Sequence, residues 1–453
     1  MKNFRFTYLI LEDDLFYMIS KTLLEQYFGG IGRALSSRNY RVYWYGHLFS
    51  SNGVWIYVIS SQWLIFHLTQ SPAWLGAIGF AYLAPVFFIG PIAGAIADRF
   101  GQRRTAIVAL VIGILLAATI AGVIYFGTLT PTLMLVFTII QGIFFAFDFP
   151  SRQALIPQMV KRSDISAAIG MNTTTYNTSS FTGPIIGGSL LAFGNSAADP
   201  TAGAALGYAT FAFANCFMLV GVSRVNVKPM PSKNLEGVSL VLGVLKDLKS
   251  GIKYVSQSRY LLMLMGLSLF FAFCLRSYQN LMAGFAESLF SLDEQGLGNL
   301  FAAKGVGALL VALFFARRGR THGLTKVCTC GAGVGGVTII LFVFSTYWPQ
   351  VLLISAVLGG VVVATDLAIM TLIQNVVADE YRARVISIAL AISVGIPAIG
   401  SLAIGFLAEY IGLQFAMSLS GIIVLIAALF IGAKILNNAS GIESTTPGTD
   451  EVK

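Results

Sequence analysis

Apolar stretches of about 20 residues recur along this chain from Tyr43 to Leu436. A helix of that length is what crossing the hydrocarbon core of a bilayer requires. The chain has 453 residues, of which 56% are hydrophobic and 11% charged, whereas a soluble globular chain carries about 25% charged residues. So few charges cannot cover the surfaces of several soluble domains. The sequence therefore predicts a polytopic helical membrane protein and excludes soluble enzymes, nucleic-acid-binding modules and secreted disulfide scaffolds.

The apolar pattern predicts an all-α fold of twelve transmembrane helices in two halves of six. We divide the chain into a cytoplasmic N-terminal arm (1–40), a first half (41–224), a basic cytoplasmic linker (225–259), a second half (260–437) and a polar C-terminal tail (438–453). The expected spans are 43–67, 72–97, 105–126, 131–150, 166–193, 204–224, 260–285, 297–316, 325–346, 350–375, 384–411 and 413–436.

The positive charges fall on one side of this arrangement. The formal net charge is +9, and every lysine and arginine except Arg276 and Lys304 lies in the arm, in the tail or in connections on their side. Neither residue type occurs in the opposite connections, near Gln70, Thr130, Asn195, Asp293, Trp348 and Gly412. Because basic loops stay on the cytoplasmic side, we expect a multi-pass protein of the cytoplasmic (inner) membrane with both termini inside.

The arm, 1–40, does not resemble a signal peptide, because acidic residues 12–14 interrupt its only apolar stretch. From Leu15 to Phe28 apolar residues recur at helical spacing, as in a helix that lies on a membrane surface. A dispensable arm fits the pattern equally well.

None of the four cysteines is placed to cross-link an outer loop. Cys216 and Cys274 lie within spans, and Cys328 and Cys330 lie near the inner end of the ninth. Residues two apart on a helix point to different sides, so Cys328 and Cys330 do not suit one metal ion. We expect free thiols, no metal and no cofactor.

The two halves echo each other at a spacing of 218 residues. At that spacing Asp148 matches Asp366, and the loop that begins at Asp98 matches the loop that begins at Ala316. Parallel repeated halves around a site near mid-membrane are a common design of secondary transporters. The repeat therefore favours a transporter.

The loop after the second span has the most specific motif. It reads Gly94-Ala-Ile-Ala-Asp98-Arg99-Phe-Gly101-Gln-Arg103-Arg104. Gly101 permits a tight reversal, Asp98 can face a helix N-terminus, and the arginines hold the loop inside. The string resembles the signature loop of the major facilitator superfamily, which implies a cytoplasmic gate. The matching loop of the second half lacks the acidic residue, so only the first loop has the full motif.

Further stretches narrow the resemblance. They are Ser71-Pro72-Ala-Trp-Leu75-Gly76, Phe147-Asp148-Phe-Pro150-Ser-Arg152-Gln153, Asn172-Thr-Thr-Thr-Tyr176-Asn177, Gly251-Ile-Lys253-Tyr254-Val255 and Arg382-Ala-Arg384-Val385. Together they are similar to the superfamily branch that contains the enterobactin exporter and macrolide-efflux proteins, of the transmembrane secretion effector type. The resemblance covers about 40–437 and implies efflux of a siderophore or drug.

The fifth span also resembles a motif of exporters, usually proton antiporters, in Gly183-Pro184-Ile-Ile-Gly187-Gly188. Ordinary packing of small residues between helices is the alternative. Exporters of this type often carry arginines at positions that Thr138 and Ser180 occupy here, which counts against proton coupling through those arginines.

Two cations lie within spans, where an ionised group is costly and needs a reason. Arg276 and Lys304 both fall in the outer half, and Asn280 follows Arg276 by one helical turn. One interpretation is a basic wall that recruits an anionic or catecholate-like substrate. The alternative is an outer gate in which Arg276 or Lys304 pairs with Glu287 or Glu409.

Two carboxylates lie deeper. Asp148 precedes Arg152 by four residues, so a local ion pair explains it more simply. Asp366 has no such neighbour in sequence, and we prefer it to Asp148 as the residue that carries the coupling proton.

Polar residues in the first and fifth spans must face a wet cavity or a partner helix, because lipid cannot satisfy their amides. The complete set of cavity candidates is Asn52, Trp55, Gln62, Asn172, Tyr176, Asn177, Arg276, Asn280 and Lys304.

These observations predict a secondary transporter, not an enzyme, that exports a small organic molecule by alternating access. Its expected partners are that molecule, protons and the lipid bilayer, with no nucleic acid, and we expect a monomer. Uptake of a small solute, a lipid flippase and a non-transporting membrane scaffold are the alternatives.

Overall fold

The computed structural model describes residues 30, 32–195, 199–226, 249–318 and 322–443. Three predicted regions therefore lie wholly or largely outside the described residues. They are the amphipathic segment of the arm, most of the linker 225–259 and most of the tail 438–453.

Over the described residues the chain forms twelve long helical segments. The first half contains α2 (Arg38–Thr69), α3 (Pro72–Phe100), α4 (Gln102–Tyr125), α5 (Pro131–Met159), α6 (Ile165–Gly194) and α7 (Ala202–Arg224), with a short η1 (Arg162–Asp164) before α6. The second half begins with α9 (Arg259–Phe270), η2 (Phe271–Leu275), η3 (Arg276–Leu281), α10 (Met282–Gly284) and η4 (Phe285–Leu289), which together form the seventh segment. It continues with α11 (Glu294–Arg318), α12 (Leu324–Phe344), α13 (Trp348–Val376), α14 (Arg382–Ile411), α15 (Leu413–Ala427), η5 (Ala428–Gly432), α16 (Ala433–Asn437) and α17 (Ala439–Glu443).

Ten of these segments are long and apolar enough to be candidate membrane spans. The other two are α2 and α6, which contain the polar residues expected in the first and fifth spans. These two helices pack against each other, and also against α7 and α11, so much of their polar surface meets protein. The structure confirms the predicted twelve-helix fold.

The expected span limits agree with the observed helices to within a few residues, with one exception. We expected the fourth span to end at 150, but α5 continues through Pro150 and Pro157 to Met159. A proline removes one backbone hydrogen bond, yet transmembrane helices tolerate it where neighbouring helices hold the chain. The longer α5 places Arg152 inside the helix, one turn after Asp148.

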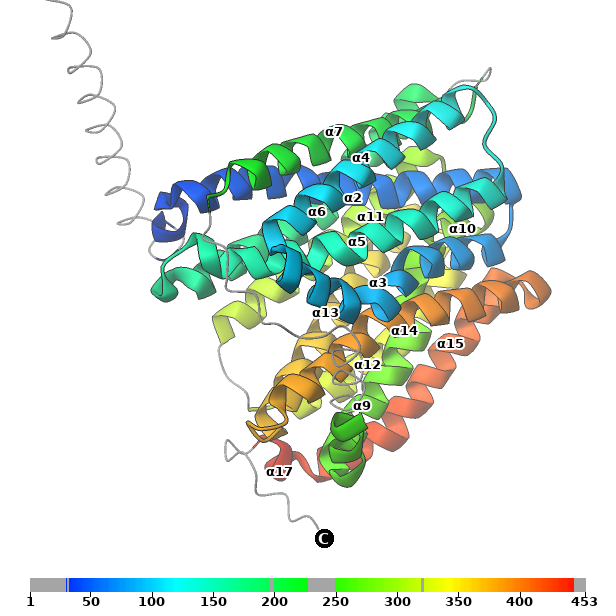
Figure 1. The fold of residues 1–453 in the computed structure, drawn as a ribbon. Helices are drawn as coiled ribbons and strands as arrows, with labels where there is room; N and C mark the ends of the chain where they lie inside the picture. Colours follow the sequence, from blue (N-terminus) through cyan, green and yellow to red (C-terminus); the bar gives the residue numbers. More distant parts are fainter. Residues whose placement is uncertain (1–29, 31, 196–198, 227–248, 319–321, 444–453) are drawn as a thin grey trace, which may run out of the picture.

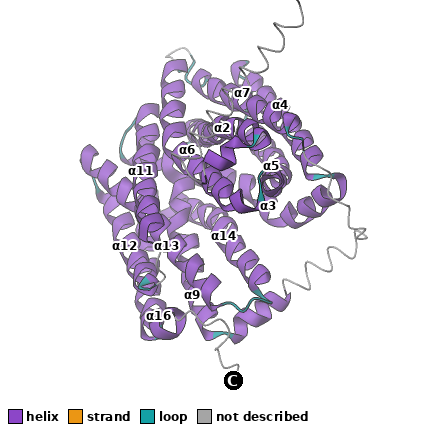
Figure 2. Cartoon of the chain, turned by 90° about the vertical axis from the view of Figure 1, so that its left-hand side faces the viewer, coloured by secondary structure: helices purple, strands orange, loops and turns teal. Residues whose placement is uncertain are grey.

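The helices run between two ends of the molecule. We call the end that holds Arg38, Arg224, Arg259 and Asn437 the terminal end, and the end that holds the α2–α3 and α14–α15 connections the loop end. Figures 1 and 2 show the two halves side by side, with α2–α7 in one bundle and α9–α16 in the other. The largest contacts between the bundles join α3 to α14 and α6 to α11.

Hydrogen bonds between the halves gather at the loop end. They join Gln70 to Glu287 at 2.6 Å, Ser71 to Glu409 at 2.9 Å and Asn195 to Glu294 at 2.7 Å. In each bond a carboxylate of the second half accepts from a neutral group of the first. The outer gate suggested by the sequence, in which Arg276 or Lys304 pairs with Glu287 or Glu409, is therefore wrong.

The signature loop turns as the sequence predicts. Gly101 has φ +93°, in the region that glycine enters without a steric cost. Asp98 accepts a hydrogen bond at 3.3 Å from Gln102, the first residue of α4. Arg103 donates to the carbonyl of Val222 at 3.1 Å, which ties the loop to the end of α7.

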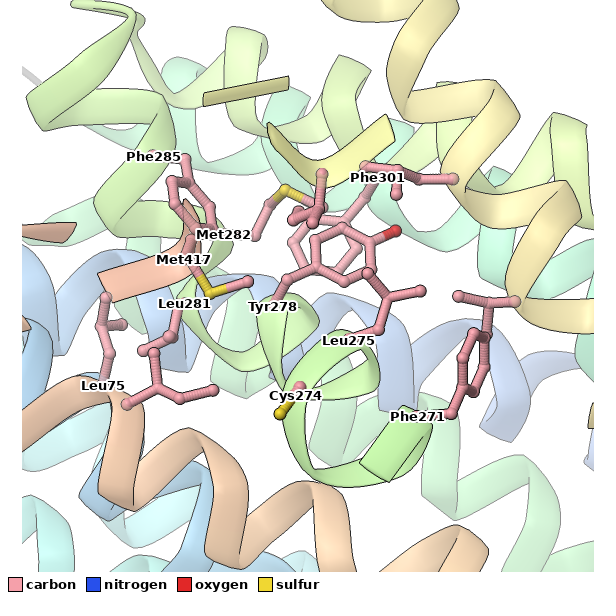
Figure 3. Packing of buried hydrophobic residues seen from close by; sticks show 14 of the residues in the cluster. Leu75, Phe271, Cys274, Leu275, Tyr278, Leu281, Met282, Phe285, Phe301 and Met417 are labelled. Carbon is pink, nitrogen blue, oxygen red and sulfur yellow. The ribbon is translucent and has the colours of Figure 1, made fainter. Parts of the chain in front are cut away.

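An apolar cluster anchors the seventh segment within the second half. Figure 3 shows Leu275, Tyr278 and Phe285 in this cluster, together with Phe301 of α11 and Met417 of α15. All five are buried to 2% exposure or less. The segment can therefore leave α-helical geometry locally while its apolar side stays fixed.

Candidate substrate and proton-coupling site

Arg276 is the centre of a polar group near the middle of the seventh segment. Its Nη1 atom lies 2.8 Å from Oδ2 of Asp366 on α13 and also donates to the hydroxyl of Ser393 on α14. The Arg276 and Asp366 side chains are 22% and 28% exposed. Three helical segments of the second half thus meet at one partly open ion pair.

Lys304 of α11 lies beside this pair. Its residue is only 6% exposed, and its ammonium donates to Oε1 of Gln279. The same ammonium lies 5.0 Å from the ring centre of Trp55 and 5.2 Å from that of Phe301, both within cation–π range. No carboxylate lies within ion-pair distance of Lys304 among the residues described.

Two aromatic residues of the first half face these cations. The ring centres of Trp55 on α2 and Tyr176 on α6 are 5.9 Å apart, and Tyr176 is 43% exposed. Trp55 thus links Tyr176 to the Lys304 ammonium, which lies 5.0 Å from the Trp55 ring centre. The site therefore combines an aromatic surface from one half with charges from the other.

The local backbone explains which neighbours of Arg276 join it. Arg276–Leu281 is a 3-10 helix between two π-helical turns, and in a 3-10 helix residues three apart share a face. Gln279 therefore faces Lys304 on the side of Arg276. Asn280, which we placed one helical turn after Arg276, donates to Ser401 of α14 at 3.1 Å, on the helix that also holds Ser393.

The first half has a second carboxylate–arginine pair. Asp148 and Arg152 lie 2.6 Å apart on α5, with side chains 9% and 10% exposed, as the local spacing predicts. Arg152 also reaches Ser50 at 3.5 Å, and Ser50 donates to Asn215 at 2.8 Å. This pair belongs to a buried network inside one half.

Comparison with known proteins decides the family. The family model described as transmembrane secretion effector matches residues 33–446. The chain belongs to the transmembrane secretion effector family. It is therefore a multi-pass transporter of the major facilitator superfamily, as its motifs and its helical fold both indicate.

Three relatives of this secretion effector are informative. An uncharacterised major facilitator transporter of Bacillus subtilis, YfiS, is 24% identical over 85% of this chain and 91% of its own. The multidrug efflux pump Tap of Mycolicibacterium fortuitum is 22% identical over 84% and 92%. The staphyloferrin A transporter of Staphylococcus aureus is 27% identical, but over only 31% and 36%.

Solved structures agree on the fold. A bacterial homologue of the human lysosomal transporter Spinster, in an inward-facing and unoccupied conformation, superposes with a TM-score of 0.68 at 15% identity, over 90% of this chain and all of that one. The D-xylose–proton symporter gives a TM-score of 0.63 at 15% identity, over 88% and 97%. At such identity the likeness concerns the fold alone.

The exporter-like motif packs against one helix of each half. A Cβ atom on Gly183 would lie 2.6 Å from Cβ of Trp55 on α2, in the same half, and one on Gly188 would lie 3.0 Å from Cα of Gly298 on α11, across the seam between the halves. The small residues of the motif therefore pack closely against neighbouring helices. That α6 also moves during transport stays a prediction. Thr138 donates to the carbonyl of Met134 and Ser180 to that of Asn177, so both occupy their positions with local bonds.

The remaining cavity candidates chiefly join helices. Asn52 bonds to Ser179 and Thr182, Asn172 accepts from Tyr40, Gln62 donates to the carbonyl of Gln279, and the carbonyl of Asn177 accepts from Ser180. Of the nine candidates, the structure gathers Trp55, Tyr176, Arg276 and Lys304 into one cluster.

Sequence reasoning missed three members of the site. Gln279 and Ser393 each accept a hydrogen bond from one of the two cations, and Phe301 lies under Lys304. A polar residue three positions after Arg276 was the available signal for Gln279. Nothing in the sequence points to Ser393, whose position depends on how α14 packs.

The cysteines can also be compared with their expected state. All four cysteines are free thiols, with Cys274 and Cys328 buried and Cys216 and Cys330 exposed. No group of metal-ligating side chains is found in the part of the chain that the structure describes.

Proposed function

We propose that the protein exports a small organic molecule of the siderophore or amphipathic drug class across a cytoplasmic membrane, in exchange for protons. The observation that carries this proposal is the central cluster, in which aromatic residues of one half face the charged residues of the other. A site divided between two halves can be exposed to each side in turn as the halves rock.

Charge supports an orientation with the terminal end in the cytoplasm. Arg38, Arg224 and Arg259 lie at the terminal end, and the connections at the loop end have neither lysine nor arginine. The positive-inside rule then places both termini inside. We propose a monomer, because each chain contains both halves of the site.

Contacts between the halves support alternating access. The bonds from Glu287, Glu294 and Glu409 close the loop end, and each can be broken without separating an ion pair. In the proposed orientation these contacts between the halves lie on the outer side of the membrane. On α3, towards the terminal end, Phe88 is 66% exposed and Phe100 is 62% exposed.

Asp366 is the residue that we assign to proton coupling. It lies within a predicted membrane span, its partner Arg276 is partly exposed, and it packs near the substrate cluster. Asp148 remains the less favoured candidate, because its partner is fixed on the same helix. The proposed direction follows the relatives, one of which is named a multidrug efflux pump.

The test compares compounds inside and outside cells with and without this gene, under iron limitation and under drug challenge. The compound should accumulate inside cells that lack the gene, and wild-type protein should restore its export. Arg276→Gln should reduce export by about tenfold or more, because a hydrogen bond to a charged group contributes roughly 1.5–3 kcal/mol. Arg382→Gln is the matched control, since Arg382 pairs with Asp379 at an exposed site. If every compound is distributed in the same way in cells with and without the gene, the proposed export function is wrong.

Proton-coupled uptake is the second candidate, and the Arg276–Asp366 pair favours it for one class of substrate, the organic anions. Net flux in membrane vesicles of known orientation separates it from export. Inward flux of a labelled solute with an inward proton gradient supports uptake, and outward exchange supports export.

A further inference from the structure

We infer that an organic anion and a proton bind the central site together, the anion replacing Asp366 on Arg276 and the proton going to Asp366. The inference rests on the proposed transport function and names the ligand class of the same site, but it does not depend on the direction of transport.

The arrangement of charges is the first step. The site contains two cations, Arg276 and Lys304, and one carboxylate, Asp366. Lys304 donates to the amide oxygen of Gln279 and contacts the rings of Trp55 and Phe301. An anion is therefore the ligand that would balance the site, and a cation would meet two like charges.

Accessibility is the second step. The Arg276–Asp366 pair joins two different helical segments, η3 and α13, and both side chains are more than one-fifth exposed. Asp366 can therefore move away from Arg276 without either helix unfolding. Planar guanidinium groups bind carboxylates in a two-point geometry, so a carboxylate ligand competes directly with Asp366 for the same donor.

The aromatic surface supplies the third step. Trp55 is half-buried and Tyr176 is 43% exposed, with ring centres 5.9 Å apart. The Trp55 ring also lies 5.0 Å from the Lys304 ammonium, which donates to Gln279 of the same 3-10 helix as Arg276. A ligand with a carboxylate on an aromatic ring can therefore reach Arg276 with its charge and contact Tyr176 and Trp55 with its ring.

Displacement of Asp366 determines whether the site takes up or releases a proton when the anion binds. A carboxylate that loses its partner within a membrane becomes neutral by taking up a proton. Of the groups around the pair, Lys304 donates to Gln279 and Ser393 accepts from Arg276, and among the described residues neither forms an ion pair with Asp366. The balanced step is one anion bound to Arg276, one Arg276–Asp366 contact broken and one proton gained by Asp366.

A consequence follows for the substrate. If anion and proton occupy the same conformations, they move in the same direction, so an anion does not exchange for protons at this site. The inference therefore narrows the proposed proton exchange to neutral compounds of the drug class, whereas an anionic siderophore would move together with protons.

The experiment measures binding of 2,3-dihydroxybenzoate to purified protein in lipid nanodiscs between pH 6 and pH 8. Wild-type affinity should fall with rising pH, towards tenfold per pH unit for one linked proton. In weakly buffered solution, binding should withdraw up to one proton per ligand. Asp366→Asn should bind the probe with no pH dependence and more tightly than wild type at pH 8.

Controls separate this inference from simpler explanations. Neutral catechol uses the same aromatic surface and should bind independently of pH. Arg276→Gln should weaken 2,3-dihydroxybenzoate at least tenfold, and Arg276→Gln/Asp366→Asn, which has no unpaired charge, repeats that test in a neutral site. Binding without pH dependence in wild type, unchanged binding after loss of Arg276, or no binding at any pH would each overturn the inference. The cell export comparison tests the proposed function separately, since it uses no added probe.

Discussion

The two halves of this transporter each contain a carboxylate–arginine pair, and the two pairs differ in how they are made and in how deeply they are buried. Asp148 and Asp366 occupy matching positions in the repeat. Asp148 pairs with Arg152 on the same helix, with both side chains at most 10% exposed. Asp366 pairs with Arg276 on another helical segment, and both remain accessible. Matching sequence positions therefore support a fixed contact in one half and an exchangeable contact in the other.

The difference has a physical basis. A pair one turn apart on a helix keeps its separation whenever the helix moves as a body. A pair between two helices changes when either helix shifts or when a ligand competes for one partner. Only the second kind can report the state of the central site.

The largest expected effect concerns the stability of the fixed pair. Asp148→Asn leaves Arg152 buried without its partner and should lower the free energy of unfolding by about 3–5 kcal/mol. Thermal unfolding of the purified protein in detergent measures the loss.

Asp148→Asn/Arg152→Gln should recover part of that stability, because it leaves no unpaired charge. An Asp148→Asn protein as stable as wild type would show that the first pair is not structural.

The second prediction concerns the Arg276–Asp366 pair, whose loss should affect transport more than stability. Arg276→Gln should reduce transport by about tenfold or more while lowering the unfolding midpoint less than Asp148→Asn does. The partial exposure of this pair lets water replace the lost contact. Transport flux and thermal unfolding, measured on the same variants, check this prediction. If Arg276→Gln lowers transport only as much as its loss of stability explains, the two pairs do not differ in the proposed way.

The third prediction concerns the seam between the halves. Gly188→Leu adds a side chain where even a Cβ atom would lie 3.0 Å from Gly298 and from the carbonyl of Glu294. We expect α6 and α11 to separate at the loop end while each half stays folded. Hydrogen exchange should increase around Asn195 and Glu294, with little change around Asp148.

Gly170→Leu is the matched control, because Gly170 lies on the same helix with open space around its Cβ position. Equal effects of the two substitutions would show that the seam is not special.

The smallest expected effect is a pH dependence at the terminal end of the second half. Although burial opposes ionisation, hydrogen bonds from Gly323 and Thr325 and the nearby His322 lower the pKa of Glu443 below its ordinary value of 4.5. A lowered pKa contributes stability that is complete above about pH 4.5 and is lost as the pH falls through the folded-state value.

Glu443→Gln should therefore lower the unfolding midpoint slightly at pH 7, by the equivalent of about 1 kcal/mol, and the difference from wild type should shrink below pH 4.5. Thermal unfolding at pH 7, 5 and 4 measures this. A difference that grows on acidification would contradict the assignment. The ion pair between Arg33 and Asp164 at the terminal end of the first half, 3.0 Å long, should be unaffected by the substitution.

Much of the fold could be predicted because its signals are local. Apolar length predicts each span, and the side on which lysine and arginine lie predicts the orientation. The Asp148–Arg152 pair was predictable for the same reason, since both residues lie on one helical turn. The end of α5 was not, because packing overrides the proline at position 150.

The candidate site was predictable only in part. Arg276 and Lys304 stood out because charge within a span is rare. The contact of Gln279 with Lys304 was not predicted, because the sequence does not show that Arg276–Leu281 is a 3-10 helix, in which residues three apart share a face. The contact between Ser393 and Arg276 could not be predicted, because it depends on how α14 packs against the seventh segment.

The sequence by itself determined that this chain spans a membrane twelve times in two repeated halves, and which of its residues are too costly to bury without a reason. Those properties depend on composition and spacing along the chain. Only the tertiary structure decided that Asp366 pairs with Arg276 and that Trp55 lies over Lys304. These contacts join residues from helices far apart in sequence, and their geometry is set by how the helices pack, which no local pattern encodes.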